Sequence, residues 1–157
     1  MQTKAQYEEA KLFESLFRGG NHCHGIYNPN SNQYLTKKEM AEVSHYLAHL
    51  EGKASIGIVP VTESGFAKFG VIDDDSHKKG GIKKDFDYDK LLKKIKFLKL
   101  PLTVFKSKSG GAHCYMLLNK FHKAVDVIHI MKKMAYALGY ERGTVEIFPK
   151  QAKLKSG

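Results

Sequence analysis

Three consecutive acids end an apolar segment near the middle of the sequence, which reads FGVIDDD at residues 69–75. In a β-strand alternate side chains point to opposite faces, so Asp73 and Asp75 share one face and Asp74 takes the other. Two carboxylates on one face offer hard oxygen ligands to Mg²⁺ or Mn²⁺, the ions that activate nucleotide phosphates. An isolated pattern of this kind is more often a solvated acidic turn. The metal site is favoured here because three negative charges stand together in a chain of net charge +10.

A second segment, SKSGGAHCY, has the composition of a tight turn that binds phosphate. Its glycines expose backbone N–H groups, the hydroxyls of Ser107 and Ser109 can donate, and Lys108 adds positive charge. His113 stands one residue into the returning strand, with Tyr115 on the same face. The competing interpretation is an ordinary hairpin loop with a structural histidine.

A third acid, Glu146, lies between two apolar residues in the short segment TVEIFPKQ. If this strand runs beside the strand that ends at Asp73, Glu146 completes a site of three carboxylates. The alternative is a surface glutamate on an edge strand, because the sequence alone does not give the order of strands in a sheet.

The length and composition of the chain exclude several classes of protein. The chain has 157 residues, 26 Lys plus Arg against 16 Asp plus Glu, and 42% hydrophobic residues, which suits one domain of ordinary size. No apolar run approaches ~18 residues, and the N-terminus carries acids where a secretory signal needs an apolar stretch. Only Cys23 and Cys114 are present, which excludes a disulfide framework and predicts a reducing, cytoplasmic setting. The positive charge favours polyanionic partners such as nucleic acid, nucleotides or anionic lipid.

The elements that must position these residues follow from hydrophobic period and turn signals. Helices are predicted at 3–17, at 36–52 behind a capping box of Thr36 and Glu39, at about 87–98 and at about 122–138. Strands are predicted at 55–61 and 67–73, joined by a short turn, at 101–106 and 112–118 as a hairpin, and at 144–148. Residues 19–34 have the composition of a loop. The prediction is an α+β fold with a mostly antiparallel sheet.

Taken together, these segments resemble the catalytic domain of the archaeo-eukaryotic primase superfamily. The resemblance is strongest to the primase-polymerases of bacteria, phages, plasmids and TOTE conflict systems, and it covers about residues 16–151. The matching motifs occur in the family order: F-x-G at 17–19, H-L-x-G at 49–52, G-I-x-P at 57–60, D-x-D at 73–75, S-x-S-G-x-x-H at 107–113 and F-P-x-Q at 148–151. No single motif is specific, so the ordered set carries the resemblance.

The resemblance implies a single catalytic domain over 1–157, either minimal or a fragment of a longer protein. A small N-terminal α/β unit (about 1–65) would pack on an RRM-like, mostly antiparallel sheet (about 66–157) that carries the acids. The chain departs from its relatives at Gly20, where many have Arg, and at Lys108, where Arg is commoner and binds phosphate bidentately.

The resemblance also implies a role for individual residues. Asp73 and Asp75 would bind two Mg²⁺ or Mn²⁺ ions, and Glu146 is the candidate third ligand. His113 would contact the phosphates of the incoming nucleotide. The remaining candidates for the same nucleotide pocket are Ser107, Lys108, Ser109 and Lys150.

The function implied is that of a DNA primase-polymerase, which joins NTP or dNTP by metal-dependent transfer on a single-stranded DNA template. A helicase or other replication domain is an expected partner, in cis or in trans, and a membrane is not. The expected location is the cytoplasm of a prokaryote, or that of a host of a virus or plasmid. Two alternatives stay open: a non-catalytic RRM-like nucleic-acid-binding domain, and a nucleotidyltransferase of the same superfamily in repair or defence.

Two lesser signals have a plain interpretation. His22, Cys23 and His24 could ligate zinc, but a fourth ligand would have to come from far away, so a polar loop is preferred. The basic segments 78–84 and 93–99 are typical of solvated faces, with a template track as the alternative.

Overall fold

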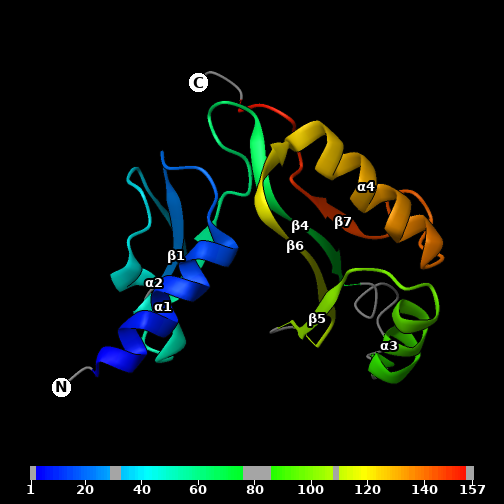
Figure 1. Cartoon of the computed structure of the whole chain (residues 1–157), viewed down its shortest axis with the longest axis horizontal. Helices are drawn as coiled ribbons and strands as arrows, with labels where there is room; N and C mark the ends of the chain where they lie inside the picture. The colour runs from blue at the N-terminus through cyan, green and yellow to red at the C-terminus, as the bar shows by residue number, and fades with distance from the viewer. Residues whose placement is uncertain (1–2, 29–32, 76–85, 108–109, 155–157) are drawn as a thin grey trace.

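The computed structural model of the protein describes residues 3–28, 33–75, 86–107 and 110–154, and within them four helices and seven strands (Figure 1). The helices are α1 (Lys4–Phe17), α2 (Val43–Leu50), α3 (Tyr88–Phe97) and α4 (Ala124–Ala137). The strands are β1 (His24–Asn28), β2 (Gln33–Lys37), β3 (Ser55–Ile58), β4 (Phe66–Asp74), β5 (Thr103–Lys106), β6 (Ala112–Lys123) and β7 (Glu146–Phe148). The fold is α+β, with antiparallel sheets in the orders β2-β1-β3 and β5-β6-β4-β7.

The central strand β4 has one face in the core and the other toward the N-terminal unit. Ile72 and Asp74 are buried on the core face, which α4 covers (Figure 1). A Cβ on Gly70 would come within 2.5 Å of the Met131 side chain, so α4 lies very close to the strand. The core between sheet and helices consists mainly of Val61, Ala67, Ile72, Leu91, Ile95, Cys114, Met116, Val127, Met131, Met134 and Leu138.

The N-terminal unit packs on the opposite face of β4 through the end of α1. The ring of Phe17 meets Phe69 and Tyr115 edge-on, with centroids 5.9 and 5.2 Å apart. Behind it, the Gly20 N–H donates to the Val59 carbonyl at 2.8 Å. A Cβ on Gly19 would stand 2.0 Å from that same carbonyl oxygen, so only glycine allows this approach.

Several predicted elements are confirmed. The helices predicted at 3–17, 87–98 and 122–138 correspond to α1, α3 and α4, and the hairpin predicted at 101–118 corresponds to β5 and β6. The last strand does lie beside β4, as β7. Within the described ranges no helix is long and apolar enough to cross a membrane.

The loop predicted at 19–34 is wrong, because this region contains β1 and the start of β2. All five residues of β2 are exposed, so the strand shows no alternation of apolar and polar side chains that a sequence pattern could detect. The capping box at Thr36 is also wrong. Thr36 pairs with Gly25 in the sheet, and α2 begins at Val43 behind the N-cap Glu42.

The strands predicted at 55–61 and 67–73 do not form one hairpin. β3 pairs with β1 in the three-stranded sheet, whereas β4 belongs to the four-stranded sheet. The turn between them exists, with the Gly65 N–H donating to the Thr62 carbonyl, but only Val61 and Ala67 form a bridge across it. The chain uses this turn to pass from one sheet to the other.

The close approach of α4 to β4 can be tested at Gly70. Replacement Gly70→Ala should lower the free energy of unfolding by about 1–3 kcal/mol, because the added methyl overpacks against Met131. The matched control is Gly25→Ala, where a Cβ meets its nearest atoms at 3.6 Å, an ordinary contact. Urea denaturation measures both, and an equal change in the two variants would contradict the packing argument.

Candidate active site

One row of side chains crosses the four-stranded sheet at the end of β4. Asp73 is paired in register with His113 on one side and with Glu146 on the other, and His113 is paired with Phe105. Directly opposite residues of antiparallel strands project from the same face, with Cβ atoms roughly 5 Å apart. We call Phe105, His113, Asp73 and Glu146 the Asp73 row.

A second row lies two residues further along the strands and therefore on the same face. Val71 is paired with Tyr115 and with Phe148, and Tyr115 is paired with Thr103. This Tyr115 row (Thr103, Tyr115, Val71 and Phe148) is mainly apolar. The face of the sheet therefore changes from charged in the Asp73 row to mainly apolar and aromatic in the Tyr115 row, two residues away along β4.

Both rows contribute to the floor of a cleft of about 500 Å³. The walls come from the N-terminal unit, with Phe13 and Phe17 from α1, Tyr46 and His49 from α2, and Gly57 and Ile58 from β3. All six family-like motifs contribute residues to the lining of this cleft, namely Phe17, His49, Gly57, Ile58, Pro60, Asp73, His113 and Phe148. Segments far apart in the sequence thus meet at one place.

Asp73 and His113 form a pair at the centre of the row. Asp73 Oδ1 lies 3.4 Å from His113 Nε2, within ion-pair reach but long for a hydrogen bond, and the side chains are 22% and 34% exposed. The Asp73 carboxylate raises the pKa of His113 above its ordinary value, burial opposes this, and the charges of Asp73 and Asp75 add to the rise. His113 is therefore held toward its cationic form.

The oxygen Oδ1 of Asp73 is buried, and its contact with His113 Nε2 at 3.4 Å does not have hydrogen-bond geometry. A buried carboxylate oxygen is costly unless donors or cations satisfy it, so this oxygen can still take a metal ion as a partner. Asp75, directly after β4, is close enough to influence His113, and Glu146 lies opposite Asp73 on the neighbouring strand β7. The donors of these three acids are oxygens, so the set fits Mg²⁺ or Mn²⁺.

The three acids are not drawn together tightly in this structure. The Glu146 carboxylate pairs with Lys150 Nζ at 3.0 Å, and both side chains are about 60% exposed. Among the described residues the acids of β4 and β7 do not form a group of three with ligand atoms within 4.8 Å of one another. The shared row brings Glu146 to the correct face, and its role as a ligand stays a prediction.

Asp74 points to the opposite face of β4, as strand alternation predicts. It is 2% exposed and accepts a hydrogen bond from the hydroxyl of Tyr140, which follows α4. Burial, and then Asp74, raise the pKa of Tyr140. Burial and the charge of Asp74 also raise the pKa of the Cys114 thiol to about 12, so this cysteine stays protonated. Asp74 therefore anchors the core and is separate from the cleft.

The turn after β5 is stabilised by the side chain of Ser107. Ser107 is nearly buried, and its Oγ accepts from the Gly111 N–H at 2.9 Å. Ser107 therefore holds the turn. The candidates Lys108 and Ser109 lie outside the described residues. Lys106 lines the cleft instead, with its Nζ 5.2 Å from the ring centroid of Tyr88.

Sequence reasoning missed several cleft residues, including Lys106, Phe105, Phe13 and Tyr46. Phe13 could have been found, because it lies one helical turn before Phe17 on the same face of α1. Tyr46 and Phe105 have no such signal. They enter the cleft only through the packing of α2 and the register of β5.

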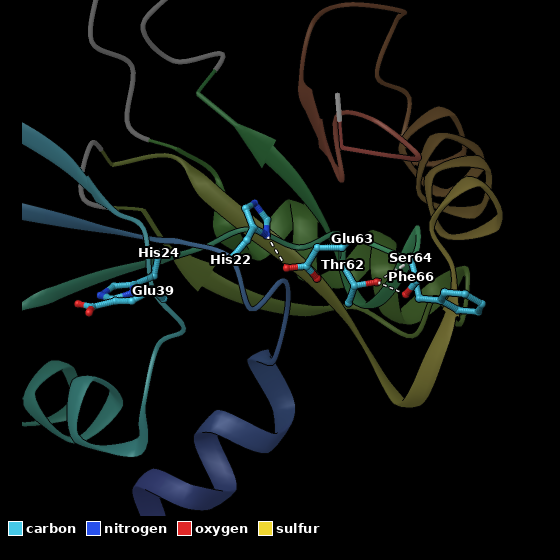
Figure 2. Close-up of polar contacts among 7 residues, drawn as sticks. All are labelled: His22, His24, Glu39, Thr62, Glu63, Ser64 and Phe66. Atoms are coloured by element: carbon cyan, nitrogen blue, oxygen red, sulfur yellow. Dashed lines mark hydrogen bonds and ion pairs between the residues drawn. The ribbon is translucent and has the colours of Figure 1, made fainter. Parts of the chain in front are cut away.

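The other polar segments have separate partners. His22 Nδ1 lies 3.1 Å from Glu63 Oε1 in the turn before β4, as Figure 2 shows. In the basic segment 93–99, Lys94 donates to the carbonyl of Leu138 at the end of α4, a favourable place for a cation. Segment 78–84 lies outside the described residues.

Comparison with known families gives a match over most of the chain. Residues 22–157 match the family model described as TOTE conflict system, Archaeo-Eukaryotic Primase domain. This match covers most of the chain and includes every strand of both sheets. Comparison with curated proteins gives no match. Domains of this family are of the nucleotidyltransferase type and are generally metal-dependent.

The pairing of Asp73 with His113 can be measured directly. In the presence of a chelator, Asp73→Asn should lower the pKa of His113, because its main stabilising partner loses its charge. Because the pKa of His113 is raised in the folded protein, the pair with Asp73 stabilises the fold fully below the unfolded histidine pKa of about 6.5. This stabilisation is lost as the pH rises through the folded pKa of His113. NMR titration of the imidazole measures the shift. The control Asp74→Asn, on the other face, should leave it unchanged, and equal shifts in both variants would refute the pairing.

Proposed function

We propose that this chain, which belongs to the archaeo-eukaryotic primase family of TOTE conflict systems, is a DNA primase-polymerase. The family indicates a nucleotidyltransferase. The proposal adds the substrates: NTP or dNTP, and a single-stranded DNA template. It also assigns the chemistry to the cleft between the N-terminal unit and the four-stranded sheet.

The observation that carries the proposal is the adjacency of the Asp73 row and the Tyr115 row in one cleft. A nucleoside triphosphate has the same division, with a charged phosphate chain and an apolar base joined by a sugar. The cleft volume of about 500 Å³ is within the usual range of small-molecule sites. We therefore assign the triphosphate to the Asp73 row and the base and sugar to the aromatic side.

The basic groups of the cleft bind and orient the phosphates. His113, with its raised pKa, presents positive charge beside Asp73, and Lys106 adds a second cation on the neighbouring strand. Such fixed charges stabilise the developing charge of phosphoryl transfer without reorganisation. Asp73, Asp75 and Glu146 would hold Mg²⁺ or Mn²⁺, which when bound neutralises the triphosphate and lowers the pKa of the attacking hydroxyl.

The proposed reaction transfers a nucleotide from a nucleoside triphosphate to a 3′-hydroxyl group. The 3′-oxygen of the growing strand, or of the first nucleotide, bonds to the α-phosphorus of the incoming nucleotide. The bond from that phosphorus to the bridging oxygen breaks, pyrophosphate leaves, and the hydroxyl proton passes to water. The protein's contribution is to align these groups, because positioning supplies much of the acceleration in phosphoryl transfer.

The aromatic side chains of the cleft support a role in holding bases. Phe17, Phe148 and Tyr115 line the cleft beside the charged row, and aromatic rings stack on any base without reading its sequence. The net charge of +10 favours a polyanionic template. A helicase or other replication domain, in cis or in trans, is the proposed partner that supplies single strands.

The description of the family favours a second setting for the same chemistry. A conflict system is a defence system, so the nucleotidyl transfer would serve defence instead of replication. The catalytic residues would be the same in both settings. A non-catalytic nucleic-acid-binding domain is the outcome if transfer is not observed.

The acids can be tested with matched substitutions along β4. Asp73→Asn and Asp75→Asn should each lower nucleotide incorporation at least about a hundredfold, the scale seen when one electrostatic stabiliser is removed. The control Asp74→Asn keeps an acceptor for Tyr140 and should retain incorporation. The assay uses single-stranded template, labelled nucleotides and Mn²⁺ or Mg²⁺. Equal product from Asp73→Asn and wild type, or no product from wild type with DNA bound, would reject the catalytic assignment.

The third ligand has its own test. Glu146→Gln should raise the Mn²⁺ concentration needed for half-maximal incorporation by about tenfold or more, because one carboxylate of the metal site is lost. The control is Glu141→Gln, an exposed glutamate outside the Asp73 row. If the two variants need the same Mn²⁺ concentration as the wild type, Glu146 serves only its pair with Lys150.

A further inference from the structure

Three metal-ligating side chains converge in the N-terminal unit, outside the cleft. His24 begins β1, Glu39 lies between β2 and α2, and His45 lies in the first turn of α2. Their ligand atoms are all within 4.8 Å of one another, and none of the three lines the cleft. Side chains from three separate elements therefore meet at one point.

His24 is oriented as a metal ligand would be. It is 1% exposed, and its Nδ1 lies 2.9 Å from the backbone carbonyl of Glu39. A carbonyl only accepts, so Nδ1 carries the proton, and in the neutral ring Nε2 keeps a free lone pair. Nε2 is buried and has no hydrogen-bond partner among the described residues. A ligating histidine typically shows this arrangement, with its other nitrogen bonded to a carbonyl.

Glu39 contributes twice to this cluster. Its backbone carbonyl orients His24, and its exposed carboxylate is one of the three ligand groups. Figure 2 shows the two side chains beside each other. The carboxylate supplies the negative charge that a buried cation requires, because the two imidazoles are neutral when they ligate.

His45 completes the cluster from the helix. Its ring centroid lies 4.6 Å from that of His24. Its Nδ1 accepts from the Glu42 N–H at 3.0 Å, so the neutral ring carries its proton on Nε2. To ligate a metal through Nε2, the ring must move its proton to Nδ1 and give up this hydrogen bond. The structure thus brings three ligand groups together, and the third becomes a ligand by a change of tautomer.

We propose that His24, Glu39 and His45 form a site for Zn²⁺, separate from the acids of the Asp73 row. Imidazole nitrogens select zinc and similar transition metals over Mg²⁺ and Mn²⁺, which prefer oxygen. Two histidines and one glutamate are a known zinc set, with water in the fourth position. The site does not include His22 and Cys23, so the zinc ligands considered from the sequence share only His24 with it.

The proposed zinc site lies next to α2, which forms part of the wall of the cleft. A metal bound here ties β1 to the first turn of α2, and α2 also carries Tyr46 and His49 in the cleft wall. Zinc would therefore hold the wall of the cleft in place. Zinc binding at this site would be independent of nucleotidyl transfer in the cleft.

The test is zinc binding to the purified chain after removal of metals by a chelator. Calorimetry with Zn²⁺ and the visible absorption of bound Co²⁺ report affinity and ligand geometry. Wild type should bind one Zn²⁺, and Glu39→Gln should bind it at least about tenfold more weakly. The matched control Glu42→Gln changes an exposed glutamate of the same segment, retains the backbone N–H and should bind as wild type does.

A second pair of variants separates this site from the proposed catalytic one. Zn²⁺ binding should persist in the double variant Asp73→Asn/Asp75→Asn and should weaken in His45→Phe, with circular dichroism verifying that each variant is folded. The proposal is overturned if wild type binds no Zn²⁺, if Glu39→Gln and Glu42→Gln bind it equally, or if binding is lost only with the two aspartates. Nucleotide incorporation is not part of this readout, so failure of the proposed function would leave the result unaffected.

Discussion

The register of β4 between β6 and β7 is the constraint on which the rest of the structure depends. With Asp73 opposite His113 and Glu146, odd-numbered side chains near the strand end face the cleft and even-numbered ones face α4. A slip of one residue would exchange Asp73 and Asp74, burying the first and exposing the second. Two contacts on the core face oppose this slip: the fit of α4 against Gly70 and the hydrogen bond from Tyr140 to Asp74.

The cleft exists because the N-terminal unit is held against the free face of that sheet. Glycine at position 19 allows the chain to approach Val59 closely, and Lys68 donates from β4 to the Ser15 carbonyl of α1 at 2.6 Å. These contacts seat Phe17 on the aromatic part of the sheet. The motif F-x-G therefore has a packing reason, since its phenylalanine packs on Phe69 and Tyr115 in the wall of the cleft and its glycine lets the end of α1 come near enough.

The predictable parts of the fold are those with strong local patterns. Helices α3 and α4 have apolar stripes, and the β5–β6 hairpin has a glycine turn, so each could be located from its own residues. In contrast, β2 is exposed throughout and pairs at a sheet edge, which leaves no hydrophobic alternation. Thr36 satisfied a helix-capping pattern, but its backbone is used in the pairing of β2 with β1.

The sequence by itself determined which acids share a face, because alternation along a strand is a local property that separates Asp73 from Asp74. It also identified the family, because the order of the motifs along the chain can be recognised without knowing which residues are in contact. Only the tertiary structure decided that Glu146 lies opposite Asp73, and that His24 meets Glu39. The order of strands and the packing of helices depend on which distant segments bury their apolar side chains against one another. No local pattern in the sequence specifies these pairings.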